Sequence, residues 1–101
     1  MLRSLSCLLV LAPSLAWGQD IDQGHQLATR WCANCHVVER TTAAASANGL
    51  PTFPAIAASP RTTPELLRAA MSAQHGRMPD LQLSKRQQDD LIAYIQSLRH
   101  K

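Results

Sequence analysis

The sequence predicts one small all-α domain built of three to four main helices. Its 101 residues set the expectation of a single domain. Apolar residues recur at helical spacing in several stretches, and no stretch shows the alternation of a half-buried strand. A net charge of +3 is too small and too dispersed for a nucleic-acid protein, and the four glycines form no phosphate-binding loop.

Residues 1–18 have the features of a secretory signal peptide, so we expect the mature domain to span residues 19–101. A positive charge at Arg3 precedes an apolar run, and small residues stand at the two positions that a signal peptidase reads before the boundary. The alternative is an uncleaved membrane anchor, but the run is shorter than the ~20 residues that span a bilayer. We therefore expect export to the periplasm and no membrane anchor in the mature form.

The first mature helix is expected over residues 21–33, with Asp20 or Asp22 as its N-cap. Four small or apolar residues share one of its faces: Gly24, Leu27, Ala28 and Trp31. Residues 41–60 are poor in charge and rich in Ala, Thr, Ser and Pro, which is typical of a loop, with a short helical turn near residues 54–59.

Thr63-Pro64-Glu65 predicts the start of a second helix that runs to about Ala73. Its inward residues are expected to be Leu66, Leu67, Ala70 and Met71. Ser84 and Gln87 form a potential capping box that opens the last helix. The apolar stripe of that helix consists of Leu91, Ile92, Tyr94, Ile95 and Leu98.

Cys32-Ala33-Asn34-Cys35-His36 is the most specific string in the chain. C-x-x-C-H is the attachment signature of c-type haem, because Cys32 and Cys35 can add to the two vinyl groups while His36 reaches the iron. A thioredoxin-like pair would need a βαβ context, and a zinc site would need a second cluster of Cys or His ligands. We therefore expect one covalently bound haem c, with His36 as an axial ligand of the iron.

Met78 is the preferred second axial ligand, because it lies in a break between two helices and is followed by Pro79. A His/Met pair raises the reduction potential of haem iron. The alternatives are Met71, which lies on an apolar helix face, His75, and an open sixth position.

Several strings in the correct order resemble a small class I c-type cytochrome of the proteobacterial periplasmic type, over the whole mature chain. They are Trp31 to His36, Pro51-Thr52-Phe53, His75 to Pro79, and Asp90-Leu91-Ile92-Ala93-Tyr94-Ile95. The resemblance implies the cytochrome c fold, in which the terminal helices cross closely at a small residue. Gly24 would hold that position and face the Leu91 and Tyr94 side of the last helix. The family often has an aromatic residue one turn later, where this chain has Ala28.

The resemblance also implies roles around the haem. Pro51, or else Pro54, would accept the N–H of His36. Phe53 and Ile56 would pack against the ring or belong to the protein core, and Arg77 would pair with a haem propionate.

We expect a periplasmic single-electron carrier that is a monomer, is not an enzyme, and exchanges electrons through transient redox protein partners such as a dehydrogenase, an oxidase or a bc1-type complex. It is expected to bind no nucleic acid. One alternative is a haem subunit of a periplasmic dehydrogenase or oxidase complex. Another is a haem sensor or peroxidase with a labile sixth ligand.

Overall fold

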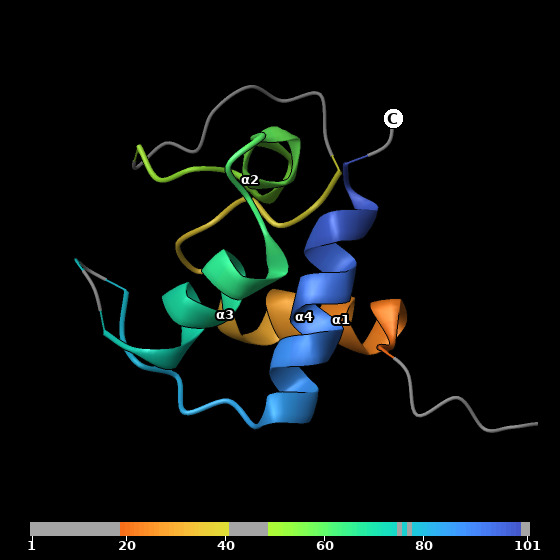
Figure 1. The fold of residues 1–101 in the computed structure, drawn as a ribbon. Helices are drawn as coiled ribbons and strands as arrows, with labels where there is room; N and C mark the ends of the chain where they lie inside the picture. Colours follow the sequence, from red (N-terminus) through yellow and green to blue (C-terminus); the bar gives the residue numbers. More distant parts are fainter. Residues whose placement is uncertain (1–18, 41–48, 75, 77, 100–101) are drawn as a thin grey trace, which may run out of the picture.

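The structure, a computed structural model, describes residues 19–40, 49–74, 76 and 78–99 (Figure 1). Four helices and no strand occur among these residues, which confirms the all-α prediction. The helices are α1 (Ile21–Trp31), α2 (Phe53–Ala58), α3 (Pro64–Ser72) and α4 (Lys85–Ser97). The predicted signal peptide, His75 and Arg77 lie outside the described residues.

Each helix begins at a residue whose side chain accepts a backbone N–H of the first turn. These N-caps are Asp20, Thr52, Thr63 and Ser84. Such a bond satisfies one of the N–H groups that have no partner inside a helix. The predicted capping box is confirmed, because Gln87 Oε1 also accepts the N–H of Ser84 at 2.9 Å. Local sequence therefore fixes where the helices start.

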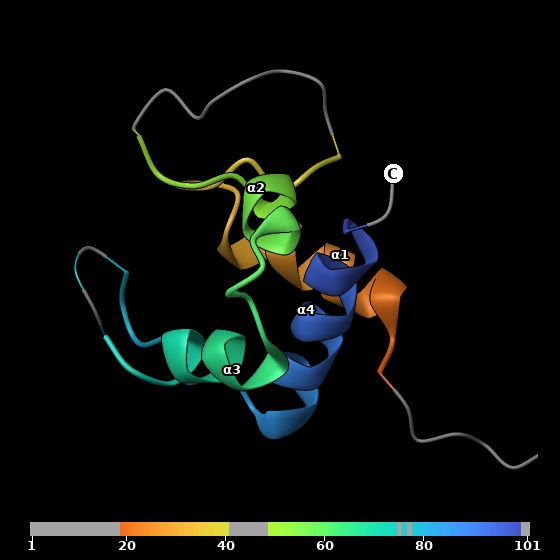
Figure 2. The same cartoon turned by 45° about the horizontal axis from the view of Figure 1, so that its top comes forward.

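Helix α4 is the centre of the fold, and α1 crosses it closely (Figures 1 and 2). Gly24 lies at the crossing, where an added Cβ would be 1.9 Å from the Asp90 carbonyl oxygen and 2.8 Å from Tyr94 Cβ. The N–H of Asp20 donates to Asp90 Oδ1 at 2.8 Å and ties the start of α1 to α4. The prediction that Gly24 faces Tyr94 is confirmed, although its nearest neighbour is the backbone of Asp90 and not Leu91.

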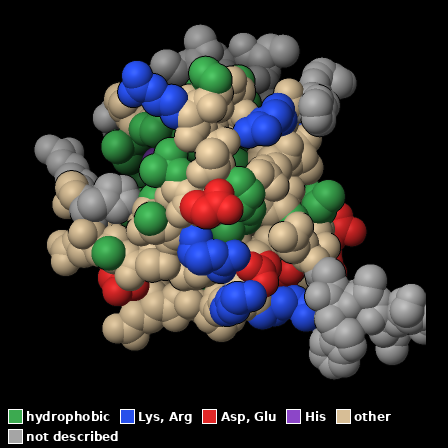
Figure 3. Space-filling model, in the orientation of Figure 1, with side chains coloured by type: hydrophobic (Ala, Val, Ile, Leu, Met, Phe, Trp, Pro, Cys, Tyr) green, Lys and Arg blue, Asp and Glu red, His purple; other side chains and the backbone are tan. Residues whose placement is uncertain are grey.

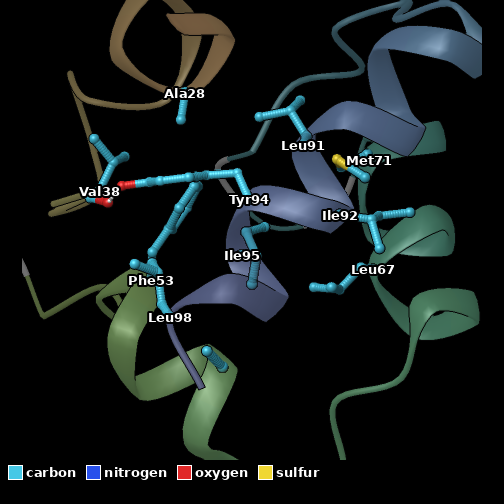
Figure 4. Packing of buried hydrophobic residues seen from close by; sticks show 11 residues of the cluster. Ala28, Val38, Phe53, Leu67, Met71, Leu91, Ile92, Tyr94, Ile95 and Leu98 are labelled. Carbon is cyan, nitrogen blue, oxygen red and sulfur yellow. Dashed lines mark hydrogen bonds between the residues drawn. The ribbon is translucent and has the colours of Figure 1, made fainter. Parts of the chain in front are cut away.

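The core forms where α1, α2 and α3 meet α4 (Figure 4). Leu91 and Ile92 are its most deeply buried large side chains, each 1% exposed. One expectation is wrong: Leu66, predicted to point inward, is 51% exposed. Trp31, which shares a helix face with the buried Gly24 and Ala28, is 52% exposed. Helical spacing places a residue on a side of the helix, but it does not show whether another element covers that position.

Histidine supplies an aromatic contact at the helix crossing. Ala28 is fully buried and too small to reach far across the crossing, whereas the His25 ring stacks on Tyr94 with a centroid distance of 4.7 Å and an interplanar angle of 14°. His25 Nε2 also lies 2.6 Å from Glu39 Oε1. An aromatic contact at the crossing is thus made by His25 and Tyr94, although Ala28 stands where the resembling family often has an aromatic residue.

Candidate haem site

The five-residue motif forms a tight turn at the end of α1. The backbone N–H of Cys32 still donates to the Ala28 carbonyl at 2.9 Å, and the N–H of His36 then donates to the Cys32 carbonyl at 2.9 Å. Cys32 is half-buried and Cys35 is exposed, and neither is in a disulfide. Because the helix ends at Trp31 and the chain turns at once, Cys32, Cys35 and His36 are held close together.

His36 is oriented by a second segment of the chain. Its Nδ1 lies 2.7 Å from the carbonyl oxygen of Pro51, which can only accept a hydrogen bond, so Nδ1 is the protonated nitrogen. The N–H of Phe53 donates to the Val37 carbonyl at 2.9 Å and holds the two segments side by side. The arrangement leaves Nε2 of His36 with its lone pair available to a metal ion. Pro54, the alternative acceptor in the sequence analysis, lies instead in the first turn of α2.

Apolar side chains surround a cavity of about 420 Å³ beside His36. Its described lining includes one of the two predicted attachment residues, both predicted iron ligands and the wall of α2: Cys32, His36, Pro51, Phe53, Ile56 and Met78. Cys35, which is exposed in the same turn, is not part of this lining. The far walls come from α3, α4 and the connections between helices: Ser59, Thr62, Leu66, Leu67, Ala70, Met71, Leu81, Leu91 and Ile95. Figure 3 shows hydrophobic side chains gathered on the surface between α2 and α3. A large apolar cavity with the Cys32 thiol and the His36 imidazole at one end, and with Cys35 in the same turn, fits a covalently attached haem.

Both methionines of the described chain line this cavity. Met71 belongs to α3, is 6% exposed, and is packed against the core. Met78 lies in the connection between α3 and α4 and is only partly buried. Met78 therefore lies outside the helices, in a segment that contributes to the cavity wall.

Burial keeps the Cys32 thiol protonated. Loss of hydration, and to a lesser extent the neighbouring Cys35, raises the pKa of Cys32 from 9.0 to about 11. At neutral pH the group is therefore an S–H, and a thioether bond at this position removes no charge from the cavity. Among the described residues, no group of three His, Cys, Asp or Glu side chains is placed to hold a metal ion without a cofactor.

The cavity wall contains Phe53, which was expected to pack against the ring or in the core, and leucines that were not found from the sequence. Phe53 is 5% exposed and its ring centroid is 5.5 Å from that of His36, so it belongs both to the core and to the cavity lining. Leu66 and Leu81 were missed as lining residues, because a leucine on a helix or in a loop gives no signal for a cofactor wall. Arg77, the predicted propionate partner, lies outside the described residues.

Tyr94 connects α4 to the segment that follows His36. Its hydroxyl is buried and donates to the Val38 carbonyl at 2.6 Å (Figure 4). Burial, and secondarily the charge of Glu39, raises the pKa of the Tyr94 phenol, with Arg40 opposing, so the hydroxyl remains a donor over the ordinary pH range.

Replacing Tyr94 by phenylalanine is expected to lower the free energy of unfolding by about 1–3 kcal/mol, because the Val38 carbonyl loses its donor in a buried place. Denaturant unfolding of the holoprotein measures this loss. Thr29→Ala, which removes a hydroxyl on an exposed face of α1, is the control and should change the stability by about 0.5 kcal/mol or less. An equal loss in both variants would contradict the role of Tyr94.

An all-α fold built around an apolar cavity, with two thiols and an imidazole in one turn, defines a haem-binding protein of the c type. The chain belongs to the cytochrome c family, whose model matches residues 21–99, and the family's cofactor is covalently bound haem c. It is similar to cytochrome c-552 of Bradyrhizobium diazoefficiens, with 40% identity over 100 residues that cover 97% of this chain and 95% of that protein. No solved structure matches the chain significantly. As a cytochrome c, it is a haem protein of electron transport that acts with redox partners.

Proposed function

We propose that this protein is a periplasmic, monohaem single-electron carrier whose iron is held by His36 and Met78. The observation that carries the proposal is that one cavity is lined by Cys32 and His36, from the turn after α1, and by Met78, from the connection between α3 and α4. In the mature chain, Cys32 and Cys35 would hold the haem through two thioether bonds. When bound, the haem supplies an iron that alternates between Fe(II) and Fe(III).

In this proposal the polypeptide fixes the axial ligands and keeps water away from the haem. Pro51 accepts the Nδ1 proton of His36, which fixes the ring orientation and raises the basicity of Nε2. Met78 would offer a neutral, soft sulfur that favours the reduced iron. The apolar walls from α2, α3 and α4 exclude water, so little solvent has to reorganise when the charge of the iron changes.

Several charged side chains on the surface are paired with one another, which favours transient, weakly steered association with partner proteins. In Figure 3 acidic and basic side chains lie next to each other over the first half of α4. Arg68 of α3 pairs with Asp89 of α4, and its hydrogen bond holds the pKa of that carboxyl below the ordinary value. Lys85 also approaches Asp89, at 3.7 Å. Since the charges pair locally, we expect weak electrostatic steering and a small transient interface with a dehydrogenase, oxidase or bc1-type partner.

The proposed location rests on the predicted signal peptide at residues 1–18. No helix in the described part of the chain is long and apolar enough to cross a membrane. Fractionation of cells that express the full sequence, followed by the intact mass of the product, tests the location and the cleavage together. A product in the periplasm that starts at Gln19 supports the proposal, and an unprocessed product in the membrane fraction contradicts it.

A redox titration and a turnover assay on the same preparation test the function. A carrier takes up and releases one electron per chain and hands it to an oxidised acceptor protein without consuming a substrate. Rapid turnover of hydrogen peroxide would instead favour the peroxidase alternative. Gel filtration of the native periplasmic fraction completes the test, because a stable subunit of an enzyme complex would run with its partners and not as a free monomer.

A further inference from the structure

The carbonyl groups at the C-terminal end of α2 accept hydrogen bonds from side chains that lie outside this helix. The last carbonyl groups of a helix have no partner inside it. Thr62 Oγ1 donates to the Ile56 carbonyl at 2.6 Å. The Arg99 guanidinium donates through Nε to the Ala57 carbonyl at 3.1 Å and through Nη2 to the Thr62 carbonyl at 3.0 Å. A single side chain that follows α4 thus holds both ends of residues 57–62.

This segment is part of the cavity wall. Ile56, Ser59 and Thr62 line the cavity, and Ala57 and Thr62 are only 1% and 7% exposed. Helix α2 has six residues, which is too short to be stable without contacts to other elements. Figures 1 and 2 show it beside the C-terminal end of α4. The buried Phe53 and Ala57 anchor α2 in the core, and Arg99 adds a polar link between the end of this wall and the end of α4.

The two bonds of Arg99 need its planar, forked shape. Nε and Nη2 point in nearly the same direction at fixed spacing, and here they reach two carbonyl groups five residues apart in the chain. A lysine at the same position would keep the charge but lacks this fork. Substitution of Arg99 by lysine can therefore separate the effect of the positive charge from the effect of the two fixed hydrogen bonds.

We propose that Arg99 is a positioning residue of the haem site, which clamps residues 57–62 against α4 and so keeps that wall of the cavity closed to water. This inference rests on the proposed binding of haem in the cavity. Opening the wall admits water, which stabilises the oxidised iron because that state carries the larger positive charge. Loss of the clamp is then expected to lower the reduction potential.

Hydrogen exchange and redox titration of the holoprotein test the proposal on Arg99→Gln and Arg99→Lys. The reporting amides are those of Ser59 and Thr62, which donate to the Ile56 and Ser59 carbonyls. The internal reference is the backbone amide of Gln88, which donates a hydrogen bond to the Ser84 carbonyl at the other end of α4. Lys85→Gln is the matched control, because it removes one positive charge from a side chain that is 84% exposed.

In Arg99→Gln we expect exchange at Ser59 and Thr62 to become about tenfold faster or more, with Gln88 unchanged and the reduction potential lowered. Arg99→Lys should show the same faster exchange and a smaller fall in potential, while Lys85→Gln should resemble the original protein. Equal acceleration at all amides, or faster local exchange with an unchanged potential, would overturn the proposal. So would an Arg99→Lys variant with original exchange rates. Failure of the ligand assignment is a separate result, because it would appear as an unchanged spectrum in a Met78 variant.

Discussion

Replacing Met78 by alanine is expected to lower the reduction potential of the haem by on the order of 0.2 V, within the ~0.8 V range that axial ligands span. The thioether sulfur stabilises reduced iron, and its removal would leave the sixth position to water or to an added ligand. The oxidised protein should lose the weak long-wavelength absorption band of iron–methionine bonding. Redox titration and visible spectroscopy measure both effects on one sample.

Met71 is the matched control, because it is the other methionine that lines the cavity. Met71→Ala removes a buried core side chain and should cost about 2–5 kcal/mol of unfolding free energy without changing the iron–sulfur band. Met71→Leu keeps the volume and serves if the alanine variant does not fold. A spectrum that changes in the Met71 variants and stays the same in Met78→Ala would refute the assignment of Met78.

Replacing Gly24 by alanine is expected to destabilise the protein by about 3 kcal/mol or more, although alanine is the better helix former by about 1 kcal/mol. The added Cβ would lie 1.9 Å from the Asp90 carbonyl oxygen, and a backbone atom inside a helix cannot rotate away. Helices α1 and α4 would have to separate, which would loosen the stacking of His25 on Tyr94. Against a total stability of about 5–15 kcal/mol, this loss endangers the fold itself.

Gln26→Ala is the control for Gly24→Ala, because it raises helix propensity on an exposed face of the same helix. Thermal or denaturant unfolding of both variants is compared at equal haem content. The comparison separates the steric clash at the helix crossing from the higher helix propensity of alanine. Because the added Cβ clashes, we expect Gly24→Ala to lower the free energy of unfolding and Gln26→Ala to leave it unchanged or raise it slightly. A stabilised Gly24→Ala variant would show that the helices do not cross as closely as the structure indicates.

Local signals in the sequence predicted the starts of α1, α3 and α4, and the C-x-x-C-H string predicts the place of haem attachment. A cap such as Ser84 acts within one turn, and the C-x-x-C-H string has its spacing from the chemistry of the cofactor, so both can be recognised from neighbouring residues. The closeness of Gly24 to the last helix followed from the family resemblance. Its contact with the Asp90 backbone became visible only with both helices in place.

Contacts between distant segments could not be predicted from local patterns. The stacking of His25 on Tyr94 joins residues far apart in sequence, and nothing in the spacing indicates it. The same holds for Arg99, whose two carbonyl partners lie in α2 and in the connection from α2 to α3. The choice between Pro51 and Pro54 as the partner of His36 also depended on how the loop folds back, which in the structure brings the Pro51 carbonyl to the imidazole.

Leu66 illustrates a limit that is specific to a cofactor protein. Its place on the apolar side of α3 predicted burial against protein, yet it is 51% exposed and lines the cavity. An apolar stripe indicates contact with something apolar, but it does not distinguish a neighbouring helix from a porphyrin. The hydrophobic face of α3 is therefore divided between α4 and the proposed haem site.

The visible spectrum of the protein matured with haem, recorded oxidised, then reduced, and finally with carbon monoxide, tests most directly whether His36 and Met78 both hold the iron. Our expectation is sharp bands in the reduced protein, the weak iron–methionine band in the oxidised protein, and no shift on addition of carbon monoxide. A high-spin spectrum that shifts promptly with carbon monoxide would contradict it, because the sixth position would then be open and the protein suited to sensing or peroxidase chemistry.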